Sequence, residues 1–182
     1  MLKRLIDCHN GHGGVGQLLT FVRAESADLA KVNALIVAAV GGWPTSARLS
    51  RLAAVSLSYR ALDFEDFEMV LCYKAAAEIG VAVWQPDALI RLQNGDQVAW
   101  LHGLYVAPSA QGQGIGRELL REIARRASLR HRYSLYVRAE RFATGFFERL
   151  GGRRLSSQEG PEGGAQAYPH RFVMAVDNVA SN

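Results

Sequence analysis

The chain has 182 residues, which is enough for one domain with a buried core. Hydrophobic residues make up 49% and charged residues 21%, so the composition is that of a globular protein and excludes a disordered chain. The net charge of +4 favours an anionic ligand. The apolar segment 34–40 is too short to cross a bilayer, and no apolar run follows the basic N-terminus as in a signal peptide.

The charge pattern and the cysteine content indicate which partners and which cellular compartment to expect. Arginines alternate with glutamates in Arg117-Glu118 and Arg121-Glu122, a pattern more typical of a solvated helix face than of a nucleic-acid surface. The two cysteines, Cys8 and Cys72, cannot form a disulfide framework and favour a reducing compartment. We therefore expect a cytoplasmic protein without nucleic-acid or membrane partners, and a homodimer remains open.

Residues 1–16 form a glycine-rich segment that contains Cys8, His9 and His12. These side chains lack the second half of a tetrahedral ligand set, so no metal site is expected. We predict a flexible leader over 1–16 and one domain over 17–178.

The first half of the domain begins with a predicted strand at 17–23. Ser26 suits a helix N-cap, and Gly41-Gly42 ends that helix. A second helix is predicted from about Ser46, because five residues follow at helical spacing. These five share one stripe: Leu49, Leu52, Ala53, Ser56 and Leu57.

Three strands follow. Alternating apolar residues predict strands at 67–73 and 79–84, and Pro86-Asp87 is expected to end the second. Asn94-Gly95 predicts a turn before an apolar strand at 98–106, which Pro108 breaks.

The second half alternates helices and strands. A helix follows the glycines at 112–116, a strand is predicted at 133–137, and Gly151-Gly152 ends a short helix that carries several phenylalanines. After a glycine-rich loop at 156–169 comes a last strand at 172–176. This order of elements predicts a mixed α/β domain.

The junction between the strand at 98–106 and the next helix is the most informative segment. Its glycines let backbone N–H groups approach a ligand at the start of a helix, where phosphate is favoured. The spacing of Gly112, Gly114 and Gly116 fits neither the dinucleotide-binding G-x-G-x-x-G pattern nor a P-loop, which needs Gly-Lys followed by Ser or Thr. The residues thus predict a pyrophosphate-binding turn without identifying the nucleotide.

Two motifs resemble those of the Gcn5-related N-acetyltransferase (GNAT) superfamily. Gln111, Gly114 and Gly116 match the Q/R-x-x-G-x-G/A loop. Downstream, the second motif, N-x-x-A-x-x-F-Y-E-x-x-G-F, is matched by Ala143, Phe146, Phe147, Glu148, Leu150 and Gly151. The resemblance implies one α/β (α+β) domain with a mixed, mostly antiparallel central sheet, flanking helices and splayed central strands.

The same resemblance implies acetyl-CoA as acyl-donor cosubstrate, without a metal. Backbone groups of Leu104, Tyr105 and Val106 should pair with its pantetheine arm. Phe142 and Phe147 either line the arm or pack in the core. The pyrophosphate should be held by Gln111, Gly112, Gln113, Gly114, Ile115, Gly116 and Arg117.

Catalytic groups are less well marked. The second motif has Phe147 where the family has a proton-donating tyrosine, and Glu140 where it often has asparagine; Tyr168 and Tyr136 are alternative acids. An amine must lose a proton before it attacks the thioester, and His102 is the candidate base, since it titrates near neutral pH. His102 could equally be a buried structural histidine, and Glu140 is a weaker candidate.

These observations favour an N-acetyltransferase that acts by direct transfer on a primary amine of a small molecule or peptide. The alternative is an acyl-CoA-binding regulatory module that has lost catalysis, which would fit Phe147 and Glu140. The acceptor is not identified. The resemblance implies that acceptor specificity comes from the first two helices and the loop between the last two strands, and the aromatic residues there either form an acceptor pocket or belong to the core. This set comprises Trp43, Tyr59, Tyr73, Trp84 and the loop 156–170.

Overall fold

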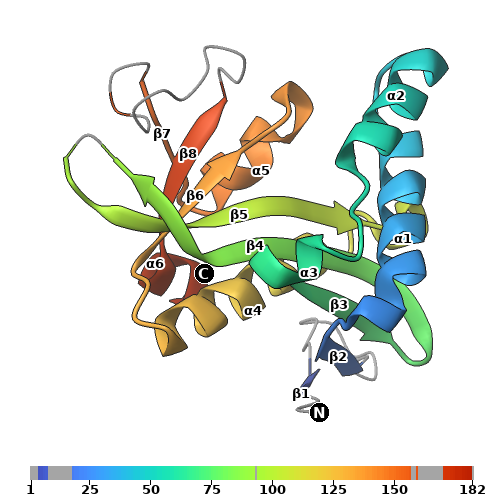
Figure 1. Ribbon diagram of the computed structural model, residues 1–182, viewed down its shortest axis with the longest axis horizontal. Helices are drawn as coiled ribbons and strands as arrows, with labels where there is room; N and C mark the ends of the chain where they lie inside the picture. Colours follow the sequence, from blue (N-terminus) through green and yellow to red (C-terminus); the bar gives the residue numbers. More distant parts are fainter. Residues whose placement is uncertain (1–3, 8–17, 93, 157–158, 160–169, 182) are drawn as a thin grey trace. The chain divides into compact units, whose positions relative to one another are not determined.

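A computed structural model describes residues 4–7, 18–92, 94–156, 159 and 170–181 (Figure 1). Within these residues eight strands form one sheet in the order β1-β2-β3-β4-β5-β6-β8-β7. The strands are β1 (Arg4–Asp7), β2 (Leu18–Arg23), β3 (Glu68–Lys74), β4 (Ala77–Arg91), β5 (Gln97–Val106), β6 (Ser134–Arg138), β7 (Arg153–Arg154) and β8 (Arg171–Ala175). The α-helices are α1 (Leu29–Gly41), α2 (Ala47–Leu57), α3 (Asp63–Asp66), α4 (Ile115–Leu129), α5 (Thr144–Arg149) and α6 (Val176–Ser181). Short 3-10 helices are η1 (Ser26–Asp28), η2 (Pro108–Ala110) and η3 (Arg141–Ala143).

The predicted mixed, mostly antiparallel sheet is confirmed. Strands β1 and β2, β2 and β3, β6 and β8, and β7 and β8 pair antiparallel, whereas β5 and β6 pair parallel. The chain divides into two compact units, and β4, β5 and α4 each contribute residues to both. The first unit comprises Met1–Val83 and Gly103–Leu119, and the second comprises Trp84–His102 and Leu120–Asn182.

The N-terminal segment differs from the expected leader at four residues. Arg4–Asp7 forms strand β1, in register with β2 from Arg4↔Phe21 to Asp7↔Leu18. The candidate metal ligands Cys8, His9 and His12 lie outside the described residues.

The core of the first unit lies between the strands β3, β4 and β5 and the helices α1 and α2, and the two helices pack against each other (Figure 1). Helix α2 begins close to the predicted start, and Ser46 caps it, since its hydroxyl accepts a hydrogen bond from the Leu49 N–H at 3.3 Å. Ser26, the predicted cap of the first helix, lies instead in η1, and the N-cap of α1 is Asp28. The buried residues of α1 follow the predicted helical period; they are Val32, Leu35, Ile36, Ala39 and Val40.

Helix α2 does not bury its predicted apolar stripe. Leu49 and Leu52 are 56% and 57% exposed, and the buried residues of the helix are Ser50 and Ala54. Ala53 and Leu57 of the stripe are partly buried against the core, so α2 packs through these residues, Ser50 and Ala54 and leaves Leu49 and Leu52 outside.

Strand β4 is longer than predicted, because it runs from Ala77 to Arg91 and does not end at Pro86-Asp87. Pro86 is buried within it, and Asp87 is exposed. A proline removes the N–H donor and fixes φ at about −65°, so a strand continues through it where that φ is accommodated and no hydrogen bond from that N–H is needed. Asp87 accepts a hydrogen bond from Arg132 Nη2 at 3.0 Å and lies 3.6 Å from Arg130 Nη1.

In the second unit, α5 ends at Gly151-Gly152 as predicted, and α4 ends in a closely similar turn. Gly151, at φ +82°, and His131, at φ +56°, occupy the left-handed position that follows α5 and α4. The next residue of each turn donates back to the helix: Gly152 N–H to Phe147 O at 2.8 Å, and Arg132 N–H to Ala127 O at 2.9 Å. No helix in the described part of the chain has the length and apolar character that a bilayer crossing requires.

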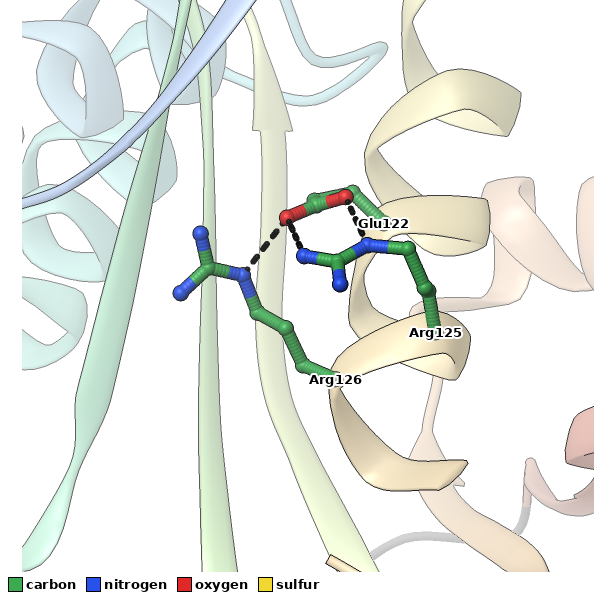
Figure 2. A network of polar contacts seen from close by, with 3 residues as sticks. All are labelled: Glu122, Arg125 and Arg126. Carbon is green, nitrogen blue, oxygen red and sulfur yellow. Dashed lines mark hydrogen bonds and ion pairs between the residues drawn. The ribbon is translucent and has the colours of Figure 1, made fainter. Parts of the chain in front are cut away.

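Helix α4 carries a buried carboxylate with two arginine partners, all three in the second unit (Figure 2). Glu122 accepts hydrogen bonds from Arg125 at 2.7 and 2.8 Å and from Arg126 Nε at 2.8 Å. Burial raises the pKa of Glu122, but the hydrogen bonds and charges of both arginines outweigh burial, and the net pKa is lowered. The carboxylate is therefore held ionised on the helix.

We expect Glu122→Gln to lower the free energy of unfolding at pH 7 by about 2 kcal/mol, because it leaves two arginines without their buried charge partner. This loss is smaller than the roughly 3–5 kcal/mol expected when a fully buried ion pair is broken, because the Arg125 side chain is 36% exposed and water screens the pair. A lowered native pKa contributes stability above the ordinary carboxyl pKa of 4.5, and this contribution is lost as the pH falls through the native pKa. The difference from wild type, measured by urea unfolding, should therefore shrink in acid.

The matched control is Glu148→Gln. Glu148 pairs with Arg154 at 3.0 Å, but both side chains are about half exposed, so its loss should change stability by less than about 1 kcal/mol. Equal losses from the two substitutions would show that burial of Glu122 adds nothing.

Candidate functional site

The glycine-rich junction between β5 and α4 lies wholly in the first unit. Pro108 breaks β5 and opens η2, as predicted, after which Gly112 and Gly114 adopt φ values of +74° and +81°. Side chains rarely tolerate this left-handed region, which explains glycine at both positions. The loop thereby turns its backbone sharply before α4 begins at Ile115.

The start of α4 presents unpaired backbone donors. The N–H of Glu118 donates to Gly114 O at 3.1 Å, which makes Gly114 the residue that opens the helical bonding. By helix geometry the preceding N–H groups, those of Ile115, Gly116 and Arg117, have no acceptor within the helix. These groups and the positive end of the helix dipole form a site suited to phosphate.

The side chains of the two glutamines in the loop hydrogen-bond to backbone carbonyls of the same segment. The Gln111 side-chain amide donates to Val106 O at 3.1 Å, and that of Gln113 donates to Ser109 O at 2.9 Å. The Gln113 carbonyl in turn accepts a hydrogen bond from Lys74 Nζ at 2.9 Å. Sequence reasoning missed Lys74, and no local pattern could have found it, since 39 residues separate it from Gln113.

Arg117 adds a second cation to the loop. Its Nη2 lies 3.6 Å from the position that a Cβ on Gly114 would take, and its side chain is 48% exposed. Arg117 Nε also lies 3.8 Å from Glu118 Oε1. The loop thus combines backbone donors with basic side chains.

The end of β5 precedes this loop in the same unit. The parallel register of β5 with β6 runs from Ala99↔Leu135 to Leu101↔Val137, and Leu104, Tyr105 and Val106 follow it along β5. The Tyr105 ring is buried in the core and packs on Gly103, where a Cβ would come within 2.4 Å of the ring. Only backbone atoms of Tyr105 are therefore suited to binding a ligand.

The candidate base, His102, lies on β5 in the second unit, as does Trp100. The rings of Trp100 and His102 are in edge contact, with centroids 4.5 Å apart, as expected for residues two apart on one face of a strand. The guanidinium of Arg138 lies over the Trp100 ring, 4.9 Å from its centroid. His102 itself is half-buried.

The other candidates of the second unit are found in different environments. Glu140 is exposed and its carbonyl accepts the Ala143 N–H at 2.9 Å, and Phe142 is 46% exposed. Phe147 is buried against Phe146 and Phe172, with ring centroids 5.1 and 5.9 Å away. This packing fits the core alternative for Phe147, and its role in binding stays a prediction.

The structure adds little support for the alternative acids or for the residues expected to bind the acceptor. Tyr136 is fully buried, and its hydroxyl accepts from Arg138 Nε at 3.4 Å, whereas Tyr168 and most of the loop 156–170 lie outside the described residues. Tyr59 and Trp84 are buried, and burial raises the pKa of Tyr59. Among the described residues no three His, Cys, Asp or Glu side chains gather as a metal-ligand group.

Comparisons with known proteins agree with this arrangement. Residues 65–151 match the Acetyltransferase (GNAT) domain family. None of the curated proteins matches the sequence. Among solved structures, the chain is similar to a GCN5-related N-acetyltransferase from Rhodopseudomonas palustris, with 17% identity, 85% of this chain and 94% of that chain covered, and a TM-score of 0.66.

Two further structures show the same likeness. One is the PaiA N-acetyltransferase from Thermoplasma acidophilum in complex with coenzyme A, with 11% identity, 86% and 98% coverage, and a TM-score of 0.61. The other is an acetyltransferase of the GNAT family from Staphylococcus aureus Mu50, with 13% identity, 87% and 99% coverage, and a TM-score of 0.62. At such identities these structures establish the fold alone. Residues 65–151 thus match the GNAT acetyltransferase domain family, and the chain has the Gcn5-related N-acetyltransferase fold.

Proposed function

We propose that the chain is an acetyl-CoA-dependent N-acetyltransferase that acts on a primary amine of a small molecule or peptide. The observation that carries the proposal is the junction from β5 to α4, where Gly112 and Gly114 turn the backbone and the N–H groups at 115–117 have no acceptor within the helix. We assign the pyrophosphate of acetyl-CoA to the segment 111–117. We assign its pantetheine arm to backbone groups of Leu104, Tyr105 and Val106.

The proposed reaction is a direct attack in a ternary complex. His102 accepts a proton from the acceptor ammonium, and the amine nitrogen then bonds to the thioester carbonyl carbon. The C–S bond breaks, the electron pair leaves with sulfur as the coenzyme A thiolate, and the nitrogen loses its second proton to water as the amide forms. Since an ordinary thiol has a pKa of about 8.5, water or a weak acid can protonate this leaving group without the family's tyrosine.

Cysteine burial supports direct transfer over an acyl-enzyme. Cys72 lies on β3 with no exposed surface, so its sulfur cannot meet a bound thioester. We expect the double substitution Cys8→Ala and Cys72→Ala to keep turnover within about threefold, provided that circular dichroism shows an unchanged fold. An acetylated cysteine that forms and decays at the rate of turnover, seen by intact-protein mass spectrometry, would contradict direct transfer.

One observation favours a second candidate, an acyl-CoA-binding regulatory module. Phe147, at the position of the family's acid, is packed in the core and has no proton to donate. Thiol release in a screen of amines against acetyl-CoA separates the two candidates. An enzyme releases thiol with at least one amine, whereas the regulatory module binds acetyl-CoA in calorimetry and releases none.

A further inference from the structure

Lys74, the last residue of β3, places its ammonium against the glycine loop. Its Nζ donates to Gln113 Oε1 at 2.9 Å, and the same Gln113 side chain donates to Ser109 O at 2.9 Å. Lys74 is half-buried, and all three residues belong to the first unit. A cation from a distant strand is therefore joined to the loop through one side chain.

The backbone around Lys74 holds this cation in place. Lys74 is paired with Leu19 in the register between β3 and β2. The next residue, Ala75, has φ +55°, a conformation that non-glycine residues adopt only at a cost, and it begins the turn into β4. The ammonium thus projects from the end of a paired strand, and less conformational entropy is lost when it binds a ligand.

The charge of Lys74 is not neutralised by its contact with the loop. Its partner Gln113 is a neutral amide, and a charge-assisted bond from an ammonium to a phosphate oxygen is roughly twice as strong as a bond between neutral groups. Arg117 brings a second cation to the same loop, with Nη2 beside Gly114. Both cations therefore lie beside the segment 111–117, to which we assign the pyrophosphate.

We propose that Lys74 is a phosphate-binding residue of the acetyl-CoA site, which nothing in the family motifs assigns. On binding, its ammonium exchanges the Gln113 carbonyl for a phosphate oxygen of the cosubstrate, either in the pyrophosphate or in the 3′-phosphate. The inference rests on the proposed function, since it requires acetyl-CoA at this loop. It extends the site from the loop to the turn between β3 and β4.

Calorimetric titration with coenzyme A and with 3′-dephospho-coenzyme A tests the assignment. We expect Lys74→Met to weaken coenzyme A binding about 10-fold and Lys74→Arg to stay within about threefold of wild type. The loss should shrink at high salt, because mobile ions screen a charge contact. A loss with both ligands assigns Lys74 to the pyrophosphate, and a loss with coenzyme A alone assigns it to the 3′-phosphate.

Two comparisons separate a phosphate contact from a brace that only holds the loop. Lys31→Met removes a lysine whose partner is Asp28, at 2.9 Å on the same unit, and should leave the affinity unchanged. In a Gln113→Ala background the brace is already absent, so Lys74→Met should still cost about 10-fold if Lys74 binds phosphate. Wild-type affinity in Lys74→Met, or no further loss in the Gln113→Ala background, overturns the inference. A wild-type protein that binds no coenzyme A overturns the proposed function instead.

Discussion

Replacing Gly114 by valine is expected to weaken acetyl-CoA binding by at least about 100-fold while leaving the fold intact. Gly114 has φ +81°, and a left-handed conformation costs an L-residue roughly 1–2 kcal/mol, with β-branched residues affected most. The valine variant should relieve this strain by turning the loop. The N–H groups at 115–117 then lose the alignment on which the proposed pyrophosphate contacts depend.

The control for backbone strain is Gly95→Val. Gly95 has φ +88° in the turn between β4 and β5, and a Cβ there meets nothing within 4 Å. Both variants carry similar local strain, but only Gly114 lies in the proposed site. Affinity that falls equally in both variants, or in neither, would remove the glycine loop as the binding site.

Replacing His102 by alanine is expected to lower kcat/KM by about 100-fold with little change in acetyl-CoA affinity. If His102 takes the proton of the acceptor amine, wild-type kcat/KM should rise through the ordinary titration range of histidine, roughly pH 6 to 7.5, and the alanine variant should lose that rise. A histidine that only packs against Trp100 predicts a different result. Its removal would lower the melting temperature and leave the pH profile unchanged in shape.

His131→Ala is the matched control for this profile. His131 is an exposed imidazole in the same unit, beyond the end of α4, and should not alter the rise. If His102→Ala retains both near-normal turnover and the rising limb, the base lies elsewhere, and Glu140 and His170 are the next residues to change.

The parts of the fold that the sequence predicts well are those whose signals are local. The glycines of the loop, Pro108 before it and the apolar period of α4 all lie within a few residues of the structure they determine. The six apolar residues that the helical period places on the inner side of α4 are all buried, and so is Glu122; the six are Ile115, Leu119, Leu120, Ile123, Ala124 and Ala127. The family assignment followed from the same segment.

What the sequence could not predict depends on contacts between distant segments. The passage of β4 through Pro86 depends on whether a neighbouring strand needs that N–H, which the local sequence does not encode. The exposure of Leu49 and Leu52 depends on which face of α2 meets α1. The roles of His102, Glu140, Phe142 and Phe147 in catalysis or binding remain predictions, since their surroundings in the second unit fit more than one role.

The burial of Cys72 has a practical consequence for measuring the proposed reaction. A colorimetric thiol reagent detects any accessible sulfhydryl, so the released coenzyme must be distinguished from the protein's own side chains. A cysteine with no exposed surface reacts only when the sheet opens at β3, and its contribution over an assay of minutes is set by that opening rate. The same property makes Cys72 a built-in reporter of this opening. In a Cys8→Ala background, the rate at which Cys72 is alkylated measures how often β3 separates from its neighbours.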